Sequence, residues 1–179
     1  MFNRKNWPLL LVVVLLVSSL AACTSGGATV PDREVEISVD EAMMAQEMGM
    51  AGMMMGSVEW TESQFSSLLS VLIEQNGAEN NPIDSVTAWF EPDMMYLRVQ
   101  MVDGTMPMGD TLDLAGSVSV ENNFVVVDLQ SASAGPFTVG GSILGPISAH
   151  INKALQDPSL GVAVGVEMGE GTIMVELAQ

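Results

Sequence analysis

The sequence predicts an α+β fold in which a curled antiparallel β-sheet of five to seven strands packs against two main helices. Three observations carry this prediction. An apolar stripe of helical period follows a capping motif. Apolar and polar residues then alternate along four consecutive segments with no helical segment between them. A second helical stripe and a final pair of alternating segments follow. The 179 residues, 48% of them hydrophobic, suffice for one domain.

The start of the predicted domain mixes strand and helix signals. Val35, Ile37 and Val39 alternate with polar residues, which predicts a short strand. Asp40 is placed to cap a helix over residues 41–48. The Met-rich stretch beyond it carries three glycines, Gly49, Gly52 and Gly56. Because glycine disfavours the helix interior, we expect the helix to stop before them.

The first main helix has both a start signal and a buried face. Thr61-Glu62-Ser63-Gln64 has the form of a capping box, in which Thr61 and Gln64 each bond the other's backbone N–H. One apolar stripe follows at helical spacing: Phe65, Leu68, Leu69, Leu72 and Ile73. We expect this helix to end near Asn76-Gly77.

The four alternating segments predict an antiparallel meander. They cover residues 86–90, 97–101, 112–120 and 124–132. The last two are joined by Asn122-Asn123, and Asn tolerates the left-handed backbone that a tight turn requires. Since no helix separates these strands, neighbours in sequence should be neighbours in the sheet.

A second helix and a hairpin complete the expected fold. Gly145 and Pro146 suit the N-cap and first turn, and Asp157-Pro158 suits the end of this helix. Its expected apolar face consists of Ile147, Ile151, Ala154 and Leu155. The expected hairpin has inward residues Val162, Val164 and Val166 on one strand and Ile173, Val175 and Leu177 on the other.

The first 22 residues predict a secretory signal. Arg4 and Lys5 precede an uncharged apolar run over residues 7–17, and small residues follow. Leu20-Ala21-Ala22-Cys23, a Leu and two small residues followed by a Cys, resembles the lipobox of bacterial lipoproteins. The resemblance implies that diacylglycerol is attached to the Cys23 thiol, that cleavage occurs before Cys23, and that the new amine is often acylated. It implies a protein of the cell envelope that faces the extracytoplasmic side.

This prediction divides the chain into three parts. Residues 1–22 are the lipoprotein signal peptide, residues 23–34 a flexible tether, and residues 35–179 a single globular domain. Loss of Arg4 and Lys5 with the signal takes the net charge from −17 to −19. Anionic head groups would repel such a body, so the acyl chains on Cys23 must hold it to the membrane.

Composition argues against several function classes. Five basic residues against 22 acidic ones cannot build a surface that neutralises nucleic-acid phosphates. The single Cys rules out an internal disulfide framework, and no Ser nucleophile motif is present. The lone His150 is expected at the boundary of the second helix, and Asp103, Asp110 and Asp113 lack calcium-loop spacing. We therefore predict no enzyme, catalytic residue, metal site or cofactor.

The Met cluster allows two interpretations. Seven of the chain's 15 methionines fall between Met43 and Met55. Thioethers are ligands for Cu(I), which would make this a copper-handling protein. Alternatively, a flexible apolar segment packs on the sheet or covers an apolar opening, for which the adaptable Met side chain is suited.

The predicted layout resembles small bacterial lipid-binding lipoproteins, in which a curled antiparallel sheet wraps a helix as in half of a tubular lipid-binding domain. The resemblance implies a groove that holds an acyl chain or another apolar ligand. Four small residues on the strands are compatible with such a space: Ala115, Gly116, Ala132 and Gly165. A lipid-anchored binding module is thus the first functional hypothesis. A structural or adaptor lipoprotein whose acidic surface meets a basic protein is the second, and the copper-handling protein is the third.

Overall fold

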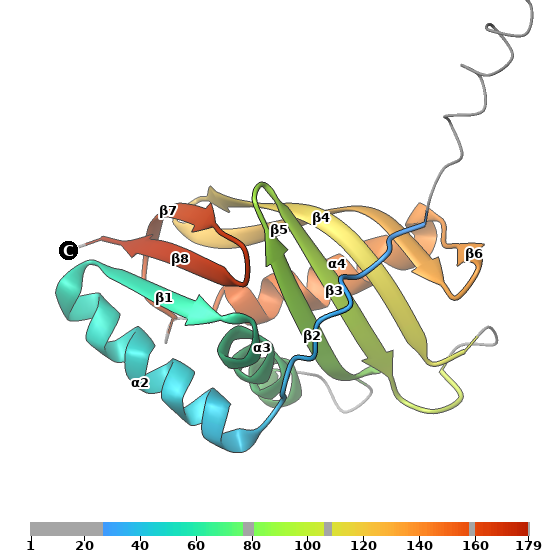
Figure 1. Ribbon diagram of the computed structural model, residues 1–179, viewed down its shortest axis with the longest axis horizontal. Coiled ribbons are helices and arrows are strands. Elements are labelled where there is room, and N and C mark those ends of the chain that lie inside the picture. Colours follow the sequence, from blue (N-terminus) through green and yellow to red (C-terminus); the bar gives the residue numbers. More distant parts are fainter. Residues whose placement is uncertain (1–26, 77–80, 106–108, 158–159, 179) are drawn as a thin grey trace, which may run out of the picture.

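The fold is α+β, as the sequence predicts, and its strands form two antiparallel sheets (Figure 1). The computed structural model describes residues 27–76, 81–105, 109–157 and 160–178. The larger sheet has strand order β2-β3-β4-β5-β6 and the smaller one β1-β8-β7. Elements follow in the order α2 (Val39–Met55), β1 (Ser57–Thr61), α3 (Glu62–Asn76), β2 (Ile83–Glu91), β3 (Met94–Met101), β4 (Thr111–Glu121), β5 (Phe124–Ala134), β6 (Phe137–Thr138), α4 (Gly141–Leu155), β7 (Ala163–Met168) and β8 (Thr172–Leu177).

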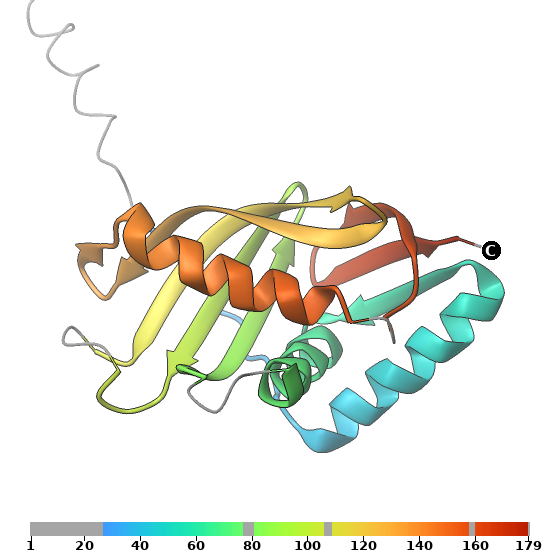
Figure 2. The same ribbon diagram turned by 180° about the vertical axis from the view of Figure 1, so that it is seen from behind.

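The predicted four-stranded meander is confirmed. Strands β2 to β5 pair with their sequence neighbours, and the short β6 extends the sheet. Asn122 and Asn123 form the β4–β5 turn with φ of 51° and 68°. The sheet curls around α3 and α4, which lie on its concave face (Figure 2). A β-bulge between Ala115 and Gly116 contributes to this curvature.

Helices α3 and α4 bury the stripes that the sequence predicts. The capping box of α3 forms in full, because Gln64 N–H donates to Thr61 Oγ1 at 3.3 Å and Thr61 N–H donates to Gln64 Oε1 at 3.1 Å. All five residues of the α3 stripe are buried, as are the four predicted for α4. The α3 ring of Phe65 meets Phe90 of β2 edge-on, with centroids 5.2 Å apart. The core therefore lies between the two helices and the curled sheet.

The smaller sheet was not predicted as a separate unit. Strand β1 pairs with β8, so a segment next to the capping box joins the C-terminal hairpin. Ile173, Val175 and Leu177 are buried as expected. The inward orientation predicted for this strand is wrong at Val164 of β7 and at Val162 just before it, which are 54% and 49% exposed. A bulge between residues 163 and 165 shifts the register, and Ala163 faces the core instead.

Two helix starts also differ from the prediction. Helix α4 begins at Gly141, four residues before the expected cap Gly145, so Pro146 lies inside the helix. Residues 34–38 are extended without strand pairing. The cap of α2 is Ser38, whose Oγ accepts a hydrogen bond from Glu41 N–H at 3.2 Å, and not Asp40. The acids at positions 40 and 41 instead fill the first turn, where the helix dipole favours negative charge.

Side chains of α3 seal the outer edge of β2. Three of them, spaced four residues apart, accept hydrogen bonds from alternate backbone N–H groups of the strand: Glu62 from Phe90, Ser66 from Ala88 and Ser70 from Val86, at 2.8, 2.8 and 3.0 Å. Four residues of a helix rise about 6 Å, and two residues of a strand rise about 6.7 Å. The spacing of the three α3 side chains therefore matches the spacing of the three β2 N–H groups. Helix α3 thus takes the place of a further strand.

The edge of β5 is closed in a similar way by α4. Asn152 Oδ1 accepts a hydrogen bond from Val127 N–H at 2.8 Å, and Asn152 Nδ2 donates to Val127 O at 3.1 Å. The side-chain amide therefore bonds both backbone groups of one residue, as a neighbouring strand would. Open edges invite pairing with other chains, and these contacts occupy part of both outer edges of the meander.

Candidate functional site

Helix α2 packs on the rest of the domain through its small residues. Its buried positions are Ala42, Ala45, Gly49 and Gly52, which share one helix face, and it contacts β1 and α3. A Cβ placed on Gly52 would lie 2.7 Å from Val58 Cβ and 2.8 Å from Ser57 O, so only glycine permits this approach. Trp60 Nε1 donates to Ala45 O at 2.9 Å and fixes the middle of the helix.

The seven methionines lie on the outside of α2. Their exposed fractions run from 38% at Met48 to 88% at Met54. Met43, Met50 and Met54 are separated by seven and four residues and so form one stripe, and Met44, Met48 and Met55 form a second. Single exposed apolar side chains are ordinary, but a helix face of this kind is typical of an interaction surface. We call these seven residues the Met face.

Acidic residues accompany the Met face. Helix α2 carries Asp40, Glu41 and Glu47 and contains no Lys, Arg or His. Glu47 lies along the stripe of Met43, Met50 and Met54, since it follows Met43 by four residues and precedes Met54 by seven. Glu59 is exposed on the adjacent strand β1. A surface of this kind complements a partner surface that is apolar in the middle and carries basic residues at its border.

The Met face adjoins further exposed apolar residues on the smaller sheet. A Cβ on Gly161 would lie 3.3 Å from Met53 Cγ, so this methionine contacts the segment that leads into β7. Val162 follows directly, and Val164 is exposed two residues later. The apolar surface at this end of the molecule therefore includes residues from α2 and from β7.

One apolar cavity inside the described part of the fold is small. A cavity of about 20 Å³ lies between α3, β5 and the smaller sheet, lined by aromatic and aliphatic residues that include Phe65, Leu69 and Val175. Drug-sized ligands occupy pockets of about 300–1,000 Å³. A larger open crevice of about 550 Å³ separates β4 from β7, but its lining includes the carboxylates of Asp93 and Glu167. The first space is smaller than a typical ligand pocket, and the lining of the second is partly charged.

Two of the four small strand residues proposed to leave room for a ligand, Gly116 and Gly165, lie close to other groups. A Cβ on Gly116 would clash with the backbone of Asp128, so this glycine allows the bulge of the sheet. A Cβ on Gly165 would lie 2.6 Å from a Glu176 carboxylate oxygen. Ala115 is buried at 6% exposure and Ala132 at 1%.

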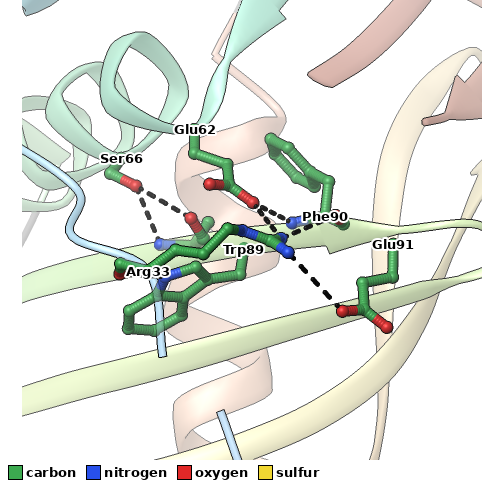
Figure 3. Close-up of polar contacts among 7 residues, drawn as sticks. Arg33, Glu62, Ser66, Trp89, Phe90 and Glu91 are labelled. Carbon is green, nitrogen blue, oxygen red and sulfur yellow. Dashed lines mark hydrogen bonds and ion pairs between the residues drawn. The ribbon is translucent and has the colours of Figure 1, made fainter. Parts of the chain in front are cut away.

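The segment before α2 is held by a polar cluster around Arg33 (Figure 3). Arg33 Nη2 donates to Glu62 Oε1 at 2.7 Å and to Phe90 O at 3.1 Å, and Nη1 lies 3.7 Å from a Glu91 oxygen. Trp89 Nε1 donates to Arg33 O at 2.9 Å. The hydrogen bond to Glu62 raises the pKa of Arg33 above its ordinary value, against the opposing effect of desolvation. Residues 27–34, the described part of the predicted tether, therefore include a specific anchor point.

The remaining predicted candidates are not brought together. Cys23 lies outside the described residues. His150 Nδ1–H donates a hydrogen bond to Pro146 O, 2.9 Å away, on α4. Asp110 Oδ1 accepts from Gly104 N–H at 3.3 Å, which is a turn contact, while Asp113 pairs with Arg98 at 2.7 Å. In the described part of the chain, no three His, Cys, Asp or Glu side chains are grouped to hold a metal ion.

The chain was compared with protein-family models, with curated proteins and with solved structures. Neither protein-family models, nor curated proteins, nor solved structures gave a significant match to the chain. Within the ranges that the structure describes, no helix is both long and apolar enough to cross a membrane.

Sequence reasoning missed the main feature of the site, which is that α2 continues through its glycines. The usable signal was the spacing of Ala42, Ala45, Gly49 and Gly52 by three, four and three residues. That spacing places all four on one face, where small side chains allow close packing. The methionines then have only the outer surface left.

Proposed function

We propose that this protein is a lipid-anchored, non-enzymatic adaptor of the cell envelope that docks a basic amphipathic segment of another protein on its Met face. The observation that carries the proposal is the exposure of all seven methionines on a helix that packs through Ala and Gly. Cys23 would carry the acyl chains, as the lipobox implies. The adaptor is favoured over a carrier for an apolar ligand because the enclosed cavity measures only about 20 Å³.

The chemistry of the Met face suits such a partner. Methionine is unbranched and polarizable, so a Met-rich surface adapts to apolar side chains of different shape. The partner's basic residues would meet the carboxylates of Asp40, Glu41 and Glu47, and the net charge of −19 that remains after loss of Arg4 and Lys5 would speed the encounter. An amphipathic helix that lays its apolar face on this surface uses a common mode of recognition.

A synthetic 18-residue helix of Leu and Lys serves as the probe in calorimetric titrations at about 0.15 M salt, near physiological ionic strength. We expect binding that weakens at least tenfold in the variant M43S/M50S/M54S, which keeps every charge of the protein. The matched control V102S/F137S removes two exposed apolar residues outside the surface formed by α2 and β7 and should bind as the parent does. If the two variants bind the peptide with equal affinity, the binding depends on nonspecific charge attraction and not on the methionines, which contradicts the proposal.

One further titration and one analysis of the purified domain separate the other hypotheses. The copper-handling hypothesis would be favoured if the parent protein binds Cu(I) but not the peptide, and if the M43S/M50S/M54S variant no longer binds Cu(I). A fatty acid that co-purifies with the domain would favour the carrier.

The anchor is tested independently. The Cys23→Ser variant should leave the membrane fraction and appear in the soluble fraction, because it lacks the thiol that is acylated. Retention of this variant in the membrane would show that the apolar segment over residues 7–17 stays in place as the anchor.

A further inference from the structure

The described chain enters the domain beside the β5–β6 hairpin. Ser133 Oγ donates to Ala28 O at 2.8 Å, and a Cβ on Gly27 would lie 2.6 Å from Ser133 Cβ. The neighbour of Ser133, Ala134, pairs with Phe137 of β6. Both views place this entry point near β6 and the start of α4, at the end of the long axis opposite β7 and β8 (Figures 1 and 2).

The lipobox cysteine is close to this entry point in sequence. Cys23 precedes Gly27 by four residues, and an extended chain spans at most about 3.6 Å per residue, or about 14 Å in all. An acyl group on Cys23 would therefore keep the β5–β6 end of the domain within that distance of the bilayer. The far end, with the C-terminal part of α2, has no such restraint.

The same end of the molecule is built from uncharged sequence. Residues 23–31 contain no Asp, Glu, Lys or Arg, and neither do residues 129–152, although the chain has 22 acidic residues. These two stretches meet at the contact between Ala28 and Ser133. The β3–β4 loop, which carries Asp103 and Asp110, leaves the sheet on the other side of this end (Figure 1). Anionic head groups therefore meet little repulsion from the entry side.

An aromatic side chain projects from this uncharged surface. Phe137 is 58% exposed, and the turn residues Gly135 and Pro136 before it are exposed as well. Every other phenylalanine of the described chain is buried or half-buried. Apolar residues at a membrane surface bury themselves at the boundary between head groups and acyl chains.

We propose that the β5–β6 hairpin is a membrane-contact surface, in which the ring of Phe137 inserts into the interface of a bilayer that carries the acyl chains of Cys23. This inference rests on the lipid anchor of the proposed function. One ring is too small to hold the protein on a membrane, so the anchor supplies attachment and the hairpin sets orientation. Helix α2 is then presented away from the bilayer, where a protein partner can reach the Met face (Figure 1).

The test uses the full chain, produced with its own signal segment and reconstituted in vesicles of phosphatidylethanolamine and phosphatidylglycerol. Phe137→Trp places a reporter in the hairpin, and Val164→Trp is the matched control, since Val164 is 54% exposed at the opposite end. Trp7 leaves with the signal segment, and the native Trp60 and Trp89 are each 4% exposed, so the quencher does not reach them and the parent protein gives the unquenched reference. Lipids brominated in the acyl chain quench only a tryptophan that reaches them.

The proposal expects at least threefold stronger quenching for Phe137→Trp than for Val164→Trp, with emission at shorter wavelength. If circular dichroism shows that Phe137→Trp is unfolded, Thr138→Trp in the same hairpin carries the same expectation. Equal quenching, or stronger quenching at position 164, overturns the proposal. The Cys23→Ser variant tests the anchor separately. If Cys23→Ser is released from the membrane while the anchored Phe137→Trp variant is not quenched, the anchor stands and only the proposed orientation is contradicted.

Discussion

Ser66 Oγ on helix α3 accepts a hydrogen bond from the backbone N–H of Ala88 on strand β2 at 2.8 Å, and Ser66 is fully buried. The hydroxyl also lies 3.5 Å from Ala88 O. One serine side chain thus replaces the backbone of a neighbouring strand at this position. The helix can lie against an open sheet edge without leaving that amide unpaired.

Replacing Ser66 by Ala should lower the free energy of unfolding by about 1–3 kcal/mol, because the buried amide of Ala88 then has no partner. Urea denaturation measures the loss. Ser119→Ala, at an exposed position on β4, is the control and should change stability by less than about 0.5 kcal/mol. Equal effects at the two serines would show that water reaches the β2 edge.

The glycines of α2 give a pair of substitutions with opposite signs. Gly49→Ala should stabilise the protein by up to about 1 kcal/mol, since Ala favours helix and its Cβ would lie at an ordinary 3.4 Å from Trp60. Gly52→Ala should destabilise it by about 1–3 kcal/mol, because the added Cβ overlaps Val58 and Ser57. Thermal unfolding of both variants measures the difference. A stabilising Gly52→Ala would contradict the close packing of α2 on β1.

Arg33 should contribute more to stability than Arg98, although each pairs with a carboxylate at 2.7 Å. Arg33→Ala leaves the Glu62 carboxylate, 11% exposed, without its cation and should cost about 1–2 kcal/mol after solvent screening is allowed for. Arg98→Ala breaks a more exposed pair and should cost less than about 1 kcal/mol. Urea denaturation of the two variants compares them, and a larger loss for Arg98→Ala would contradict the anchoring role of Arg33.

The same contact defines how much of the N-terminal segment the domain needs. A chain that begins at Asp32 keeps Arg33 and should be soluble and unfold cooperatively. A chain that begins at Glu34 lacks the cation and should show a lower midpoint in urea. Equal midpoints would mean that the polar cluster of Figure 3 contributes nothing to stability.

The elements that local sequence determines were predictable. The α3 capping box, its apolar stripe and the Asn122-Asn123 turn each depend on residues within a few positions of one another. The features that were missed depend on distant contacts. Gly52 interrupts a helix by propensity, but Val58 and Ser57 on β1 make it the residue that fits.

The inward serines of α3 illustrate the same limit. Ser66 and Ser67 lie outside the apolar stripe used to predict α3, yet they are 0% and 1% exposed, because Ser66 accepts from Ala88 N–H and Ser67 accepts from Ser38 N–H. The pairing of β1 with β8 joins segments more than 100 residues apart, which no local pattern reveals. The Met face follows from these contacts, since they decide which side of α2 is buried.

The most direct test of the central claim is a methyl NMR titration of protein labelled at the methionine ε-carbon with the Leu/Lys helix. We predict that the largest shifts fall on the seven Met resonances of α2, while buried Met95 and Met101 move little. Shifts that spread over all methionines, or that leave those of α2 unmoved while the peptide binds, would contradict the assignment of α2 as the docking surface.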